Sequence, residues 1–165
     1  MNENVFVIED GLLKEYLGSD SEVTIPEGVT SIGEGAFAWC RSLTALTLPD
    51  SMTDVGRYAF RACEGLTVFP LSVGVKTIGD WAFNSCKGLT EITIPHGVTS
   101  IGEWAFADCS GLISVFIPSS VETMGKNVFA LCANVTIYCE HPAKPPAWEV
   151  DWNPLKRPVV WNYKP

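Results

Sequence analysis

The chain has 165 residues, of which 47% are hydrophobic, and its formal net charge is −8 at pH 7. This length supports one domain with a substantial core, and no apolar run approaches the ~20 residues of a membrane-spanning helix. The negative charge argues against nucleic acid and anionic lipid as partners, because both attract basic surfaces.

The first 20 residues are expected to form an N-terminal cap. The segment VFVIEDGLLKEY, residues 5–16, contains two alternating runs about an Asp10-Gly11 pair, which is typical of a β-hairpin. The N-terminus has no basic region followed by a long apolar run, so it does not resemble a secretory signal peptide. If the native chain begins at Met1, we expect a cytoplasmic protein.

A 23-residue repeat follows the cap. The nine residues IGEWAFADC, 101–109, have close copies at 32–40 and 78–86. Glycine, phenylalanine and cysteine each recur at this interval, as Gly33, Gly56, Gly79, Gly102 and Gly125, Phe37, Phe60, Phe83, Phe106 and Phe129, and Cys40, Cys63, Cys86, Cys109 and Cys132. Five units follow without insertion or deletion, and a step of roughly 20–29 residues is typical of a leucine-rich repeat. The glycine suits a positive φ or a close backbone approach.

Each unit is expected to contain one strand and one short helical turn. The pattern L-x-x-I-x-I at 89–94 alternates as a half-buried strand does, and Pro95 would end it because proline cannot donate to a ladder. Residues 103–108 are expected to form a helical turn that packs Phe106 inward. Stacked units should then place the phenylalanines in one column. In the third unit, 69–71, the proline is displaced, which predicts a distorted or shortened strand.

Residues 138–165 are expected to close the other end of the stack. Six of the eleven prolines fall here, together with Trp148, Trp152 and Trp161. Repeat arrays need capped ends, so we interpret PVVW, 158–161, as a final strand and the tryptophans as a cover for the core. A tryptophan-lined ligand pocket is the alternative. The chain thus divides into a cap at 1–20, five repeats at 21–137 and a cap at 138–165.

The full repeat pattern is L-x-x-L-x-L-P-x-x-V-x-x-I-G-x-x-A-F-x-x-C, present across residues 20–138 and shown by LTEITIPHGVTSIGEWAFADC at 89–109. This pattern resembles the BspA-like leucine-rich repeats of bacterial proteins. We therefore expect an α/β solenoid, a right-handed leucine-rich repeat of about five coils with a parallel sheet and a cap at each end. The resemblance also implies a bacterial cell-surface protein that takes part in adhesion and host-protein binding.

The cysteines and histidines are interpreted as structural. Zinc ligands come in close pairs, whereas the repeat cysteines lie 23 residues apart. Stacked coils lie about 4.8 Å apart, but the Cβ atoms of a disulfide lie about 3.8 Å apart. We predict six free thiols, five of them in a buried column, and no metal site or cofactor. His96 and His141 are interpreted as turn and cap residues.

Two sets of variable positions are candidates for binding. An array of strands offers a concave surface for another macromolecule, with Thr47, Glu91, Thr93, Ser114 and Phe116 on its outer side. Phe116 replaces a threonine of neighbouring units and is a candidate anchor, although a lone exposed apolar residue needs no explanation.

The second set follows the repeat glycine on the turn side. One variable position reads Gly35, Tyr58, Trp81, Trp104 and Asn127 in successive units. Tyr58, Trp81 and Trp104 form a candidate aromatic column for sugar rings or a protein loop. The alternative is that these rings shield the turns, at about 0.5–1.5 kcal/mol per aromatic pair.

No phosphate loop and no nucleophile motif occurs, and features that recur once per unit indicate architecture rather than catalysis. The sequence therefore predicts a monomeric, non-catalytic module that binds another protein, of the surface adhesion type by resemblance. The alternatives are an intracellular interaction scaffold and a carbohydrate-binding module that uses Trp81 and Trp104, which makes a glycan the second candidate partner.

Overall fold

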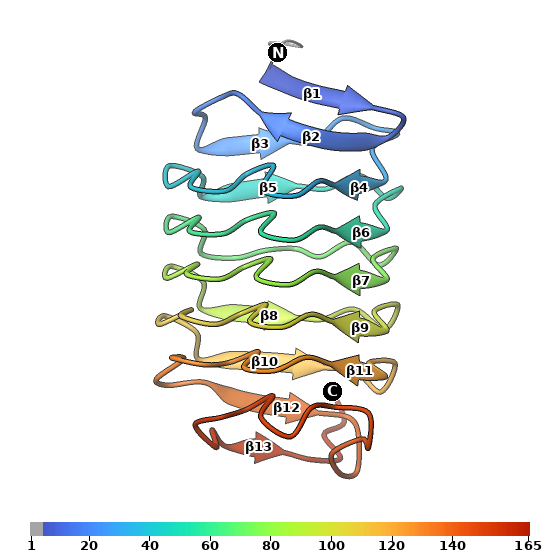
Figure 1. Cartoon of the computed structure of the whole chain (residues 1–165), viewed down its shortest axis with the longest axis vertical. Helices are drawn as coiled ribbons and strands as arrows, with labels where there is room; N and C mark the ends of the chain where they lie inside the picture. The colour runs from blue at the N-terminus through green and yellow to red at the C-terminus, as the bar shows by residue number, and fades with distance from the viewer. Residues whose placement is uncertain (1–4) are drawn as a thin grey trace.

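The computed structural model describes residues 5–165, and its regular elements are thirteen short β-strands. In chain order they are β1 (Phe6–Glu9), β2 (Leu12–Tyr16), β3 (Glu22–Thr24), β4 (Ser31–Ile32), β5 (Ala45–Thr47), β6 (Asp54–Val55), β7 (Thr77–Ile78), β8 (Glu91–Thr93), β9 (Ser100–Ile101), β10 (Ser114–Ile117), β11 (Thr123–Met124), β12 (Thr136–Cys139) and β13 (Val159–Val160). The strands stack along one axis, with the hairpin β1–β2 at one end and the C-terminal segment at the other (Figure 1).

Two faces run along this stack. The first face is a seven-stranded sheet in the order β1-β2-β4-β6-β7-β9-β11, parallel except for the antiparallel pair β1–β2. The second face, called the strand face below, consists of a pair β3-β5 and a four-stranded sheet β13-β12-β10-β8. Between these two sheets Val68 makes a single bridge to Glu91, so the third strand is shortened as the displaced Pro70 predicts.

Each coil contributes to both faces, and the described chain contains six coils rather than the predicted five. The coils are β2 with β3, β4 with β5, β6 with Val68, β7 with β8, β9 with β10, and β11 with β12. The extra coil arises because the stack continues at both ends of the repeats: β2 of the hairpin pairs with β4, and β12, which extends past residue 137, pairs with β10.

The predicted α/β class is wrong, because no helix is among the elements of residues 5–165 and the fold is a β-solenoid. In the segments expected to be helical, alternate N–H groups donate to the next coil. The N–H of Trp81 donates to the carbonyl of Glu103 and that of Phe83 to Ala105, both at 2.8 Å. An α-helix would direct these groups to carbonyls of its own turn. The described residues hold no helix long and apolar enough to cross a bilayer.

The phenylalanine column forms as predicted and fills the core. Phe37, Phe60, Phe83, Phe106 and Phe129 are fully buried, and successive ring centroids lie 5.1, 5.3, 5.2 and 5.9 Å apart. Phe69 of the shortened strand packs edge-on against Phe60 and Phe83, with centroid distances of 4.8 and 4.7 Å. This packing explains how the irregular third coil keeps the core closed.

The repeat glycine is required by close backbone approach rather than by a positive φ. A Cβ atom at Gly79 would lie 2.7 Å from the carbonyl carbon of Gly56 in the preceding coil. Side chains do not tolerate contacts of this kind with backbone, so the coils can stack at this edge only on glycine.

The repeat cysteines have a hydrogen-bonding role in addition to packing. The thiols of Cys63, Cys86, Cys109 and Cys132 each lie 3.1 Å from a carbonyl oxygen of the preceding coil, those of Phe37, Phe60, Phe83 and Phe106. All six cysteines are free thiols, and all but the half-buried Cys40 are buried. Burial raises the pKa of the Cys86 thiol to about 12 and that of Cys132 to about 11, which keeps the proton needed for donation.

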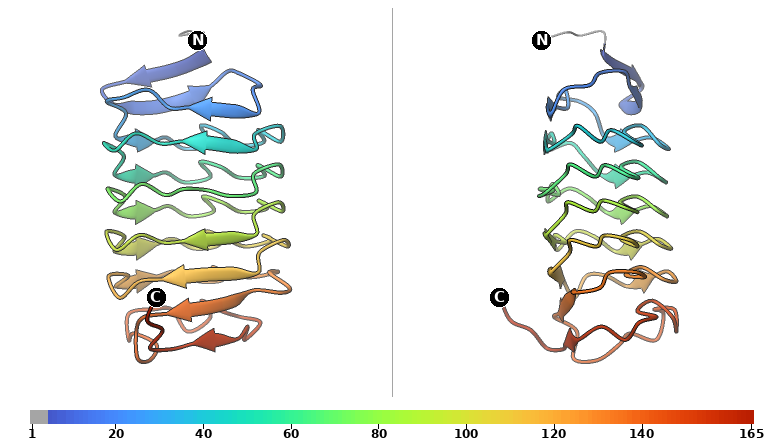
Figure 2. Two further views of the ribbon diagram at one scale, coloured as in Figure 1. Left: turned by 180° about the vertical axis from the view of Figure 1, so that it is seen from behind. Right: turned by 90° about the vertical axis from the view of Figure 1, so that its left-hand side faces the viewer.

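The hairpin β1–β2 lies at one end of the stack and the C-terminal segment with β13 at the other (Figure 2). Asp10 and Gly11 have φ values of 49° and 78°, as a two-residue hairpin turn requires. At the other end β13 pairs with β12, and Trp152 packs edge-on against Phe129 at 6.0 Å. Trp148 and Trp152 are buried, so they do not line a ligand pocket. Residues 1–4 of the predicted N-terminal cap lie outside the described part, and the division at residues 20 and 137 stays a prediction.

Candidate binding site on the strand face

The structure brings together four of the five predicted strand-face residues. Glu91 and Thr93 lie on β8, and Ser114 and Phe116 lie on the neighbouring β10. The hydroxyl of Ser114 donates to the carboxylate of Glu91 at 3.1 Å. Thr47 is exposed on β5, which belongs to the separate two-stranded sheet, so it is not part of this group.

Phe116 is not an isolated apolar residue but the centre of an aromatic cluster. Its ring stacks on that of Tyr138 of β12, with centroids 5.0 Å apart and an interplanar angle of 14°. Tyr163 of the C-terminal tail packs against both rings, at 5.6 Å from Phe116 and 5.1 Å from Tyr138. The N–H of Tyr163 donates to the carbonyl of Cys139 at 2.9 Å, which holds the tail beside β12. All three rings remain half-exposed.

The neighbour of Phe116 was missed because the repeat register changes in the last coil. A strict 23-residue period aligns Phe116 with Cys139, whereas the strands pair Phe116 with Tyr138, 22 residues on. The prediction of five units without a deletion therefore fails after Val135. The reason is strand alternation: the 22-residue offset turns Ile137 and Cys139 into the core and Tyr138 outward. This alternation of buried and exposed residues was the available signal.

The cluster borders a hollow of about 280 Å³ on the surface. Its floor is the aromatic cluster with Ile94 and Ile117, and its rim carries Thr93, His96 and Glu140, with Pro165 at one side. Most of the lining is apolar, and Thr93, His96 and Glu140 add polar groups to it.

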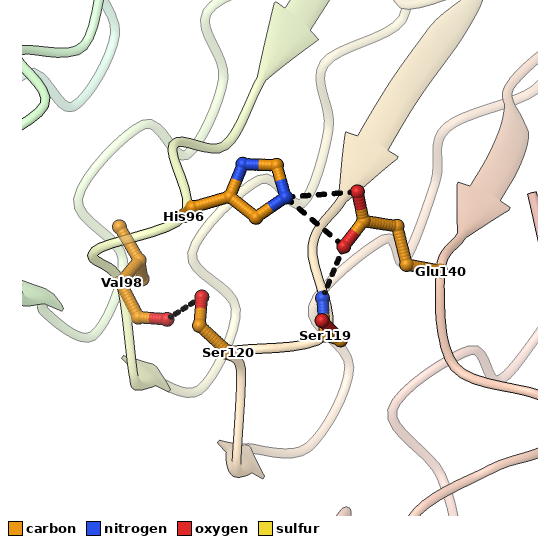
Figure 3. Close-up of polar contacts among 5 residues, drawn as sticks. All are labelled: His96, Val98, Ser119, Ser120 and Glu140. Carbon is orange, nitrogen blue, oxygen red and sulfur yellow. Dashed lines mark hydrogen bonds and ion pairs between the residues drawn. The ribbon is translucent and has the colours of Figure 1, made fainter. Parts of the chain in front are cut away.

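His96 and Glu140 form the polar rim by joining three coils (Figure 3). The Nε2 atom of His96 lies 2.9 and 3.1 Å from the two carboxylate oxygens of Glu140, and the N–H of Ser119 donates to the same carboxylate at 2.8 Å. Partial burial acts to raise the pKa of the Glu140 carboxyl, but the hydrogen bonds from Ser119 and His96 outweigh it and hold this pKa below its ordinary value. Glu140 is therefore a fixed negative charge beside the aromatic floor.

The second predicted set, the aromatic column, also forms. Trp81 and Trp104 stack with centroids 4.9 Å apart and an angle of 7°, and Tyr58 lies 6.1 Å from Trp81. All three residues have positive φ, between 56° and 59°. Trp81 and Trp104 stack face to face, which is the contact that the shielding alternative predicts, whereas Tyr58 is tilted by 42° against Trp81.

No group of three or more His, Cys, Asp or Glu side chains within residues 5–165 could hold a metal ion. The histidine and carboxylate at the rim are a pair, and they are bonded to each other and to backbone.

Comparison with known proteins agrees with this architecture. The BspA type leucine-rich repeat region matches residues 8–136 in six copies, which equals the number of coils. A leucine-rich repeat protein of T. pallidum is similar in structure, with a TM-score of 0.80 and 30% identity over 84% of this chain and 70% of that protein. A search of the curated proteins gives no match.

Two longer bacterial proteins are also similar. A leucine-rich cell surface protein of Faecalibacterium prausnitzii has a TM-score of 0.71 and 33% identity, over 76% of this chain and 35% of that one. A leucine-rich repeat protein of Bacteroides ovatus has a TM-score of 0.71 and 36% identity, over 81% of this chain and 36% of that one. The chain spans about a third of the length of these two proteins.

Proposed function

The chain belongs to the BspA-type leucine-rich repeat family, and from this premise we propose that it is a non-catalytic binding module of a bacterial surface protein. In this proposal its partner is another protein, and the partner docks on the strand face at the hollow around Phe116, Tyr138 and Tyr163.

The observation that carries this proposal is the half-exposed aromatic cluster. Three aromatic rings in mutual contact leave apolar area in water on the strand face, and covering such area is the main driving force of association. Aromatic residues at the centre of a patch and polar residues at its edge are the arrangement of protein interfaces. Thr93 and the His96–Glu140 pair, which line the hollow, supply that edge, and Glu91 extends it beside Ser114.

The surface location is proposed by similarity. The F. prausnitzii protein, 33% identical, is described as a cell surface protein, and its repeats share the fold of this chain. Adhesion is the role that this location would give to a protein-binding module. No feature of residues 5–165 favours the intracellular scaffold over it, and the carbohydrate alternative through Trp81 and Trp104 loses support because these rings face each other.

The test replaces the aromatic pair by the residue that the repeat uses at this position. Three other coils carry threonine in the place of Phe116, namely Thr24, Thr47 and Thr93, so Phe116→Thr with Tyr138→Thr removes the rings and keeps strand propensity. Wild type and variant are applied to arrays of purified extracellular proteins and glycans, and folding is monitored by circular dichroism.

We expect the wild type to bind at least one protein on the array and the folded variant to lose that binding by at least about tenfold in Kd, since interface aromatics are typical hot spots. The control is Thr47→Ala on the same face, which should bind as the wild type does. Equal binding by all three proteins would reject the proposed site.

A further inference from the structure

A second surface, distinct from the strand face, combines arginine with aromatic residues. Three of the four arginines of this acidic chain, Arg41, Arg57 and Arg61, lie on the turn side of the second and third coils. With Trp39, Tyr58 and Trp81 they form what we call the arginine patch. Its members come from three successive coils, so the stacking of the repeat, and not a local motif, brings them together.

Cation–π contacts hold the guanidinium groups in place. The Cζ atom of Arg61 lies 5.6, 5.4 and 5.9 Å from the ring centroids of Trp39, Tyr58 and Trp81. The Cζ atom of Arg57 lies 4.6 Å from the ring of Tyr58, and its Nη2 donates to the Tyr58 hydroxyl at 3.0 Å. Restraint by several rings lowers the entropy that each guanidinium would lose on binding a ligand.

These guanidinium groups make few ion pairs within the described chain. Arg41 lies 3.9 Å from the Glu64 carboxylate, which is equally close to Lys87. The ion pairs of residues 5–165 include neither Arg57 nor Arg61. Glu34 and Asp80 stand at the position of Arg57 in the preceding and the following coil, but neither is among its ion-pair partners, and the Asp80 carboxylate accepts the N–H of Glu103 at 2.8 Å. The patch thus holds two guanidinium groups without an ion-pair partner among residues 5–165, on a chain with a net charge of −8.

The orientation of the rings selects the kind of ligand. A sugar ring stacks on a free aromatic face, but the face of Trp81 is stacked on Trp104 and guanidinium groups lie over Trp39 and Tyr58. The guanidinium groups over these rings therefore present N–H donors, and their charge is positive. The planar guanidinium fork matches a carboxylate with two parallel hydrogen bonds. Trp, Tyr and Arg are also the residues enriched at the centres of protein interfaces.

We propose that the arginine patch binds an acidic segment of a partner protein, with aspartate or glutamate carboxylates seated on Arg57 and Arg61. The site lies on the turn side and does not depend on the function proposed for the strand face.

The probe is acetylated hexaglutamate, with hexalysine as the opposite charge, and binding is measured by calorimetry at about 0.15 M salt, where distant charges are screened. The test variant combines Arg57→Gln with Arg61→Gln. The control variant combines Lys76→Gln with Lys156→Gln, two exposed lysines outside the patch, and so removes the same charge. Thermal unfolding verifies that both variants are folded.

We expect hexaglutamate but not hexalysine to bind, with affinity at least about tenfold weaker for the arginine variant and nearly unchanged for the lysine variant. Equal weakening by both variants would show unspecific attraction and overturn the proposal, as would absence of binding to the wild type. A sulfated heparin hexasaccharide that displaces hexaglutamate and binds more tightly would identify a glycan site instead. Self-association that only the arginine variant loses would identify a second copy as the occupant.

Discussion

The thiol of Cys109 lies 3.1 Å from the carbonyl oxygen of Phe83, 26 residues earlier in the chain. Three other cysteines make the same contact with the coil before them. The thiol column therefore links successive coils as protonated donors, and its accessibility and protonation report directly on the stacking of the solenoid.

Thiol labelling provides the first prediction. In the native protein without reductant, a small disulfide reagent should modify Cys40 alone, because the other five thiols are buried and their raised pKa values leave almost no thiolate at neutral pH. After unfolding in guanidinium, all six should react. Fewer than six in the unfolded chain would mean that a disulfide had formed.

Stability should fall in alkaline solution. Folding raises the pKa of the Cys86 thiol from the ordinary value of 9.0 to about 12. A group whose pKa is raised by folding stabilises the native state fully below its unfolded pKa. This contribution to stability is lost as the pH rises from about 9 toward about 12. Each buried thiol contributes a slope of about 1.4 kcal/mol per pH unit in this window. Urea unfolding from pH 8 to 11 measures it. Cys86→Ala should flatten the slope by one such step, and an unchanged slope would contradict the assignment.

Replacing Leu131 by glycine should raise the free energy of unfolding of the protein. It has a φ of 62° and is 62% exposed, so its side chain contributes little while its backbone is in the left-handed region. A residue other than glycine pays roughly 1–2 kcal/mol for this backbone conformation. A glycine instead loses roughly 0.5–1 kcal/mol more conformational entropy on folding. The difference predicts that Leu131→Gly stabilises the fold by about 0.5–1 kcal/mol.

The matched control for this change is Ile113→Gly. Ile113 is 60% exposed and is not among the residues of positive φ, so glycine there should lower the free energy of unfolding by up to about 1 kcal/mol. Denaturant titration of both variants gives the two signs. Destabilisation by Leu131→Gly equal to that by Ile113→Gly would show that backbone strain at this position is negligible.

The phenylalanine column should dominate the stability of the core. Phe83 is fully buried between Phe60 and Phe106, so Phe83→Ala should cost about 3–5 kcal/mol in free energy of unfolding. Phe116→Thr, at the half-exposed cluster, should cost much less, because the cavity it leaves opens to solvent. Similar losses for the two variants, measured by thermal and urea unfolding, would contradict the placement of these rings.

The periodic residues could be predicted from the sequence, because identical coils must place Gly, Phe and Cys in identical surroundings. The absence of a helical turn in each unit could not be predicted. The pattern around Phe106 has helical spacing, but its N–H groups donate to the next coil, a choice that no local pattern records. The positive φ of Trp81 could not be predicted either, because a left-handed backbone conformation is normally expected of glycine or asparagine.

Only some residues of the candidate site could be predicted from the sequence. Strand alternation identified Phe116 and Thr93, but Tyr138 required the 22-residue pairing of β12 with β10. Tyr163 and Glu140 come from outside the repeat, where periodicity carries no information. His96 and Glu140, 44 residues apart, meet only because the strands before them, β8 and β12, lie on either side of β10 in the stack.

Photocrosslinking at the hollow tests the central claim, that the partner docks on the aromatic cluster of the strand face. Benzoylphenylalanine is introduced at Thr93, which lines the hollow, and in a second protein at Thr47, an exposed threonine of the same face outside it. With a partner identified on the array, irradiation should yield a covalent adduct from Thr93 and none from Thr47. An adduct from Thr47 alone, or equal yields from both positions, would contradict the account.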